Sequence, residues 1–198
     1  MWKKLITGVL MAVALVTLTA CGGATGTASP AASGEAKTAA PAQSKTLVVY
    51  FSATGSTKRV AEVIAENQKA DLFAINPSQP YTQEDLNYRD NNSRVVKEHA
   101  QPKLRPAYDG EVANWDNYET IYIGYPVWWQ QAPHVVYTFV EKHNFAGKKV
   151  IPFCTSVSSP LGSSGENLAK AAGTGAWQQG MRFNSGVSKN EIIDWLKK

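Results

Sequence analysis

Cysteine is nearly absent from this 198-residue chain, which contains only Cys21 and Cys154. With so few thiols a disulfide framework is excluded, and the folded part must be stabilised by its own hydrophobic core, which about 150 residues can supply. Cys154 ends the apolar run 150–154. That position favours a small buried hydrophobic side chain over a redox-active thiol.

Histidine is also scarce, and the three present, His99, His134 and His143, show no metal-binding spacing to cysteines or acids. Packing or surface roles are therefore favoured for them. The chain has no Gly-x-Ser-x-Gly elbow and no distinctive pair of acids. These absences argue against a metal centre, a serine hydrolase and carboxylate acid–base catalysis.

A concentrated basic face is missing as well. The formal net charge is +4, but Lys3, Lys4, Lys37 and Lys45 belong to the first 45 residues, and the remainder is close to neutral. Because nucleic-acid binding depends on a clustered positive surface, we expect no nucleic-acid partner.

The N-terminus carries a short apolar run, residues 5–18, preceded by Lys3 and Lys4. A run this short is typical of a signal peptide, since a spanning helix needs about 20 apolar residues. The sequence Leu18-Thr19-Ala20-Cys21 follows and resembles a bacterial lipobox. We expect residues 1–20 to be a lipoprotein signal peptide and Cys21 to carry a membrane lipid anchor. An ordinary secretory signal, with cleavage after Ala20 and a free Cys21, is the alternative.

Residues 22–45 contain no large apolar side chain and cannot form a core. We therefore expect a lipidated cysteine and disordered linker over residues 21–45 and one folded domain over residues 46–198.

Strand and helix signals alternate through the folded domain. A parallel sheet with helices on both faces follows from this alternation, so the predicted fold class is α/β, a doubly wound five-stranded parallel sheet. The predicted strands are residues 46–51, 72–75, 118–125, 149–153 and 177–183, and the predicted helices are residues 56–67, 133–143, 165–172 and a last one capped by Ser188.

Residues 80–117 exceed what a minimal crossover needs. Two pieces of this segment, residues 83–87 and 91–100, have helical patterns, and Pro102 and Pro106 then favour an extended path. We expect an enlarged second crossover that borders the functional site.

The loop after the first strand is rich in hydroxyl groups and precedes a helix. Free amides and the positive dipole end of that helix attract a phosphate, and hydroxyls add donors. The lysine spacing of a Walker motif is absent, and a simple capping turn is the alternative. The candidate phosphate ligands are Ser52, Thr54, Gly55, Ser56 and Thr57.

This loop resembles the phosphate loop of flavodoxins, which bind the phosphate of flavin mononucleotide (FMN) without a positive side chain. The resemblance covers about residues 46–198 and implies the flavodoxin-like strand order 2-1-3-4-5 and FMN as cofactor. The loop after the third strand, with Pro126, Val127, Trp128 and Trp129, is similar to a Pro-x-Trp-Trp segment of flavodoxin-like lipoproteins and related reductases. Its backbone is expected to border the flavin, and adjacent indoles suit a flat ring. Packing of both tryptophans beneath the crossover is the alternative.

The loop after the fourth strand is glycine-rich in similar proteins, so that backbone amides approach the pyrimidine edge of the flavin. The resemblance places Thr155, Ser156, Ser158 and Gly162 at this edge. Here Val157, Ser158, Ser159 and Pro160 occupy the expected glycine-rich stretch. This departure predicts an altered ring position, weaker FMN affinity or a different ligand.

Two classes of function follow. The first is an exported, membrane-anchored FMN protein that transfers electrons, either as a one-electron shuttle or as a two-electron reductase of quinone-like acceptors. The near-neutral domain, and a second loop without the glycine whose peptide flips in shuttling flavodoxins, favour the reductase. A membrane redox partner or quinone is then the expected partner. The second class is a non-catalytic cell-envelope binding module on a flavodoxin scaffold.

Overall fold

The computed structural model describes residues 44–198, which belong to one compact unit. The predicted signal peptide (1–20), the predicted lipidation site Cys21 and all but the last two residues of the predicted linker (21–45) lie outside the described residues.

The main sheet is parallel, and its strand order is β2-β1-β5-β6-β7, with β8 also paired to β6. This confirms the predicted order 2-1-3-4-5, because β5 and β6 are the predicted third and fourth strands, and β7 and β8 share the fifth position. The strands span β1 (Thr46–Tyr50), β2 (Asp71–Ala74), β5 (Thr120–Pro126), β6 (Lys149–Thr155), β7 (Ala176–Trp177) and β8 (Met181–Phe183).

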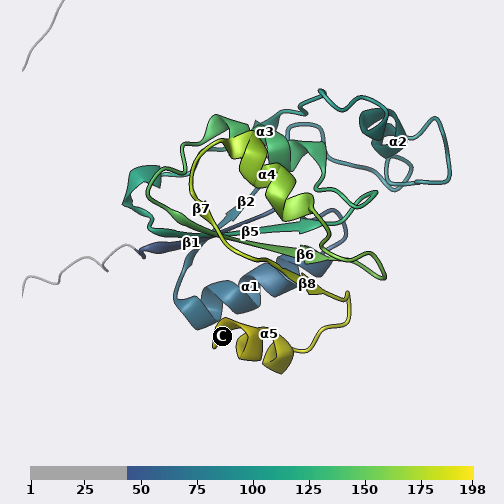
Figure 1. Ribbon diagram of the computed structural model, residues 1–198. Coiled ribbons are helices and arrows are strands. Elements are labelled where there is room, and N and C mark those ends of the chain that lie inside the picture. Colours follow the sequence, from purple (N-terminus) through teal and green to yellow (C-terminus); the bar gives the residue numbers. More distant parts are fainter. Residues whose placement is uncertain (1–43) are drawn as a thin grey trace, which may run out of the picture. The chain divides into compact units, whose positions relative to one another are not determined.

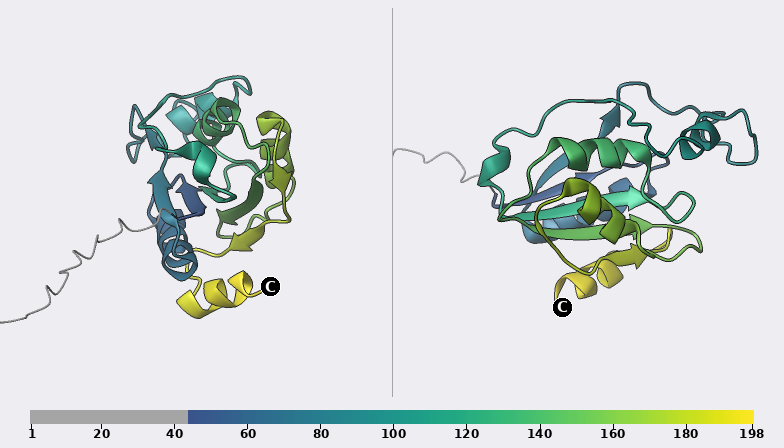
Figure 2. Two further views of the ribbon diagram at one scale, coloured as in Figure 1. Left: turned by 90° about the vertical axis from the view of Figure 1, so that its left-hand side faces the viewer. Right: turned by 45° about the horizontal axis from the view of Figure 1, so that its top comes forward.

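Helices cover both faces of this sheet, as Figures 1 and 2 show. The helices α1 (Ser56–Gln68) and α5 (Lys189–Leu196) lie on one face, and α3 (His134–Lys142) and α4 (Ser164–Ala172) lie on the other. Alternate residues of β1 therefore enter different cores: Val49 packs on the α3 side and Val48 packs on the α1 side. The continuous apolar runs of the sequence exist because these strands are buried on both faces.

The fifth position of the sheet is divided opposite Pro152 of β6. Gln178 N donates to Val150 O at 2.8 Å, so the backbone groups of Val150 face the fifth position and, by alternation, those of Pro152 do too. Proline has no N–H to give to that ladder. Opposite it, a Cβ on Gly180 would lie 2.5 Å from Pro152 O, so only glycine allows this close approach. The predicted continuous strand 177–183 is therefore two short strands, β7 and β8.

The part of the enlarged crossover between β2 and β5 that contains α2 (Arg94–His99) lies beyond the carboxyl ends of the strands (Figure 1), whereas its last part, at Trp115, returns to the amino end of β6. The crossover contains a two-stranded antiparallel sheet in which Asn76 pairs with Asp109. Its elements are β3 (Asn76–Pro77), α2 (Arg94–His99), β4 (Tyr108–Asp109) and the short 3-10 helix η1 (Trp115–Asn117).

The prediction of a helix over residues 83–87 was wrong, because this segment forms a single turn. The Asn87 side chain accepts from the amide of Arg89, and the Asp90 side chain accepts from the amide of Asn92. Such side-chain-to-backbone bonds compete with helix propagation. They also explain why α2 begins at Arg94, three residues after the predicted start.

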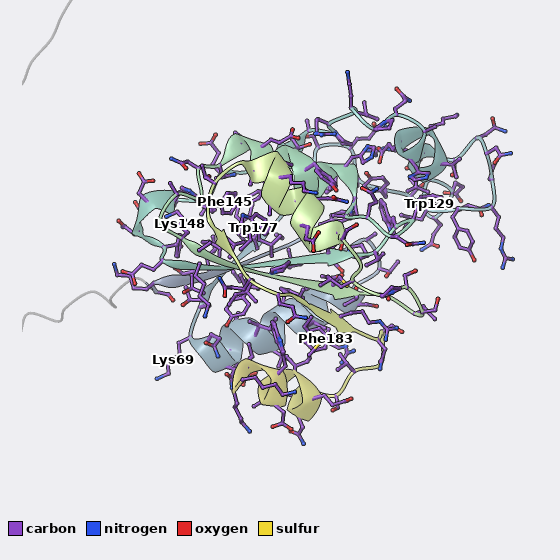
Figure 3. All side chains as sticks on the ribbon, viewed as in Figure 1. Lys69, Trp129, Phe145, Lys148, Trp177 and Phe183 are labelled. Carbon is purple, nitrogen blue, oxygen red and sulfur yellow. The ribbon has the colours of Figure 1, made fainter. Side chains whose placement is uncertain are left out.

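The amino end of β6 is closed by a buried lysine. Lys148 is 6% exposed, and its Nζ donates to the carbonyl oxygens of Tyr118 at 2.7 Å and Trp115 at 3.0 Å. Figure 3 shows Lys148 and Phe145 at the end of the domain opposite Trp129. This end is therefore a packed structural end, and the open loops lie at the other.

Candidate functional site

Three loops meet beyond the carboxyl ends of β1, β5 and β6, and Thr155 joins them. The Thr155 hydroxyl lies 2.8 Å from the hydroxyl of Thr57, at the start of α1, in a buried hydrogen bond. The Thr155 carbonyl accepts from the amide of Val127, in the loop after β5, at 3.0 Å. Residues from all three predicted loops are thus brought together at the edge where ligands of open parallel sheets bind.

The first loop, residues 52–55, leads into α1 with no side-chain cap. Gly55 occupies the N-cap position at φ 91°, a left-handed conformation that favours glycine. Its amide donates to the Ser52 hydroxyl at 3.1 Å. The first turn of α1 contains no acidic residue. Its free amides and dipole end are therefore available to an anion.

The hydroxyls of the first loop have different surroundings. Thr54 is exposed and Ser56 is half-buried, and neither hydroxyl makes a hydrogen bond within residues 44–198. Thr57 is 1% exposed, and its hydroxyl bonds to Thr155. Thr54 and Ser56 are thus free to meet a phosphate, whereas Thr57 ties the first loop to the third.

The second loop, from Pro126 to Pro133, contains a tight two-residue turn. The amide of Trp128 donates to Gln131 O and the amide of Gln131 donates to Trp128 O, each at 2.9 Å. Trp129 at φ 47° and Gln130 at φ 62° form the turn. Two successive positive φ values are usually supplied by Asn-Gly, so this turn is strained by its own side chains.

The two adjacent tryptophans point to different neighbours. Trp128 is half-buried, with its ring edge-on to Phe51 at 5.7 Å and to Tyr81 at 5.4 Å between centroids. Trp129, labelled in Figure 3, is 40% exposed. Its ring stacks on His99 at 4.5 Å between centroids, with the rings 8° from parallel. Both indoles therefore contact the crossover, which borders the loops.

A charged and aromatic group in the crossover was not among the predicted site residues. The Tyr81 hydroxyl donates to Glu98 at 2.6 Å, and Arg94 pairs with Glu98 at 2.7 Å. The Arg94 guanidinium also lies 4.1 Å from the centre of the Tyr81 ring. Burial and the Glu98 carboxylate raise the pKa of Tyr81. Arg94 and Glu98 thus fix the ring of Tyr81, which packs on Trp128 and so supports the second loop. The signal for this group in the sequence is the i, i+4 spacing of Arg94 and Glu98, which allows an ion pair along one helix face.

The third loop, residues 156–163, is held by Arg182 of β8, which sequence reasoning missed. The Ser156 hydroxyl donates to Ser159 O, and Arg182 donates to the Ser156 hydroxyl and to two carbonyls of the loop. Ser158 and Gly162 are exposed, and Gly162 has φ 54°. The sequence signal was an arginine inside the short apolar segment 181–183.

A cavity of about 180 Å³ lies between the crossover and the second loop. Trp129, His99, Arg105, His134 and Tyr137 are among its lining residues. Burial, reinforced by Arg105, lowers the pKa of His134, whose Nδ1 atom is buried without a hydrogen-bond partner in residues 44–198. A neutral imidazole therefore faces this cavity at neutral pH.

Within residues 44–198, no group of three or more His, Cys, Asp or Glu side chains is arranged to hold a metal ion. In the same part of the chain, no helix combines the length and the apolar character that crossing a bilayer requires. Burial raises the pKa of the Cys154 thiol to about 12. This agrees with a packing role for Cys154 rather than a redox role.

Comparisons with known proteins extend this description. The model of a protein family described as Flavodoxin matches residues 45–198. A protein from Bacteroides uniformis, provisionally described as a flavoprotein in its crystal structure, is 41% identical; the match covers 79% of this chain and 99% of that one, with a TM-score of 0.74. A similarly described protein from Bacteroides eggerthii is 40% identical, with coverages of 77% and 95% and a TM-score of 0.71.

A flavoprotein from Lactobacillus acidophilus, crystallised in complex with FMN, is 20% identical, with coverages of 77% and 98% and a TM-score of 0.58. At that identity the likeness concerns the fold. No curated protein matches the chain.

Proposed function

Because the chain belongs to the flavodoxin family, we propose that it binds FMN across the three loops joined by Thr155 and transfers electrons with it. The open, uncapped start of α1 beside these loops is the observation that carries this proposal. The FMN complex of the Lactobacillus acidophilus relative supports the choice of ligand.

The phosphate of FMN fits the first loop. The amides at the start of α1 have no acceptor within the helix, and the hydroxyls of Thr54 and Ser56 flank them. Gly55 lets the backbone adopt φ 91° at the N-cap, so that the amides of the first turn face an anion. Amides, hydroxyls and the helix dipole together bind a dianion without a lysine.

The ring of FMN fits between the second and third loops. Trp128 and Trp129 supply apolar surface that excludes water from one side of the ring. The Tyr81 ring packs edge-on against Trp128 and holds it in place. The loop 156–163 closes the other side with backbone groups. The bound flavin supplies the electron-transfer chemistry, and these residues orient it and exclude water.

Reduction of quinone-like acceptors is the form of electron transfer we favour. The domain is near neutral, whereas shuttles that dock by charge carry a strong field. The cavity beside Trp129 gives a small acceptor a place next to the second loop.

The leader and Cys21 support an exported protein that a lipid holds at a membrane, where a membrane redox partner or quinone is within reach. A lipid-modified N-terminal peptide, detected by mass spectrometry of the mature protein, is the expected result. Its disappearance in Cys21→Ser, together with release from the membrane fraction, is the matched control. A wild-type protein with an unmodified Cys21 would contradict the anchor.

The decisive test of cofactor binding is optical. Purified protein, as isolated or after addition of FMN, is expected to show flavin absorbance that dithionite bleaches. Protein that stays colourless and leaves added FMN fluorescence unquenched would contradict the proposal. That result would favour a non-catalytic binding module, for which the side chains of Val157–Pro160 in the third loop are the supporting observation.

A further inference from the structure

Arg182 makes a three-point attachment to the start of the third loop. Its Nε donates to the Ser156 hydroxyl at 3.0 Å, and its Nη2 donates to the carbonyl oxygens of Ser156 at 3.0 Å and Val157 at 2.7 Å. No carboxylate lies within salt-bridge distance of Arg182 in residues 44–198. Within residues 44–198, all hydrogen bonds of the Arg182 guanidinium are therefore made to this loop.

The attachment fixes the direction of two amide groups. A trans peptide unit points its C=O and its N–H in opposite directions. Because Arg182 holds the carbonyls of Ser156 and Val157 on its own side, the N–H groups of Val157 and Ser158 point away from it. Neither amide donates to any acceptor within residues 44–198. The loop thus presents two adjacent, unused donors on the side opposite Arg182.

One further hydrogen bond and two side chains make this orientation firm. The amide of Ser156 donates to Phe183 O at 3.0 Å, so the start of the loop is bound to β8 at both Arg182 and Phe183. The side chains of Val157 and Ser158 restrict a backbone that glycines would leave free. Val157 is 85% exposed, so its side chain contributes little packing that could hold the loop in place of Arg182.

We propose that Arg182 is a positioning residue that aims the amides of Val157 and Ser158 at the acceptor atoms on the pyrimidine edge of the bound flavin. This rests on the proposed FMN site, and it explains how a third loop without its glycines still offers backbone donors. Arginine suits the role because its planar fork reaches several acceptors at once, whereas lysine is a point donor.

The experiment compares two ligands in four proteins. Affinities for FMN and for riboflavin, which lacks the phosphate, are measured by flavin fluorescence in wild type, Arg182→Lys, Arg182→Gln and Thr54→Val. Arg182→Gln is expected to lower the affinities for FMN and for riboflavin by the same factor, about tenfold, which equals about 1.4 kcal/mol. Arg182→Lys is expected to lower both affinities by a smaller factor. Thr54→Val is expected to lower the affinity for FMN and to leave the affinity for riboflavin unchanged.

A matched control is Arg59→Gln. Arg59 also donates to two backbone carbonyls, those of Val187 at 2.6 Å and Ser185 at 2.7 Å, but in the segment between β8 and α5. Its loss is expected to leave both flavin affinities unchanged. Urea unfolding of every variant separates a loss of folded protein from a loss of affinity.

A second readout follows the donors themselves. In ¹H–¹⁵N NMR spectra, the amide signals of Val157 and Ser158 should shift strongly when riboflavin binds wild type, and much less in folded Arg182→Lys. Unchanged affinities in Arg182→Gln, or a loss of FMN binding with riboflavin binding intact, would overturn the role of Arg182. Failure of wild type to bind either flavin would instead refute the proposed function.

Discussion

The hydroxyls of Thr57 and Thr155, 98 positions apart in the sequence, share a buried hydrogen bond of 2.8 Å. This bond joins the start of α1 to the end of β6, and the Thr155 carbonyl extends the link to Val127. The contact therefore sets the spacing between the loop expected to bind phosphate and the loop expected to border the ring.

Thr57→Val should lower the free energy of unfolding by about 1–3 kcal/mol, because the Thr155 hydroxyl is left buried without a partner. Thr155→Val should have a similar effect. Urea denaturation of both single variants and the double variant measures the coupling. The double variant should lose clearly less than the sum of the single losses; strict additivity would mean that the bond contributes nothing.

Gln130→Gly should raise the free energy of unfolding by about 1 kcal/mol, because glycine adopts the left-handed conformation without strain. Lys69→Gly, at φ 50° after α1, should stabilise by a similar amount. Gln68→Gly is the matched control: it lies within α1 and should destabilise by about 0.5–1 kcal/mol. A destabilising Gln130→Gly would show that the side chain of Gln130 holds the turn.

Stability should fall as pH falls through and below about 6.5, the ordinary pKa of histidine. Burial lowers the pKa values of His134 and His143 in the folded state, so the unfolded chain binds protons more readily. Arg105, Glu98 and His99 face His134, and Lys142 and Glu111 face His143. Urea unfolding between pH 7.5 and 5.5 measures the dependence. The double variant His134→Gln, His143→Gln should show a flatter profile than wild type, and equal slopes would contradict this assignment.

Cys154 should react slowly with thiol reagents in the native protein near neutral pH. Burial keeps its thiol covered and raises its pKa to about 12, so little thiolate is present. Spectroscopic thiol titration in a Cys21→Ser background measures the rate. One rapid equivalent should appear only in denaturant; rapid modification of the native protein would show that β6 opens readily.

The carboxyl-end loops could be assigned before the structure because parallel strands bring their ends to one edge of the sheet. Residues 52–57, 126–129 and 155–156 do meet there, joined through Thr155. Their roles toward FMN remain predictions. The sequence shows that residues 157–160 of the third loop contain no glycine, but it does not show how the loop is held, because Arg182 lies 25 residues beyond Val157.

The sequence by itself determined the parallel sheet and the hydroxyl-rich turn before α1, because these depend on local apolar periodicity and on residues adjacent in the chain. The order of the strands followed from the resemblance to flavodoxins. Tertiary structure decided which hydroxyls are free, how the fifth position of the sheet divides and which side chain holds each loop. Thr54 and Thr57 look equivalent in the sequence, yet burial engages one and leaves the other exposed. The reason is physical: hydrogen bonding and burial depend on neighbours from distant segments, and no local pattern encodes them.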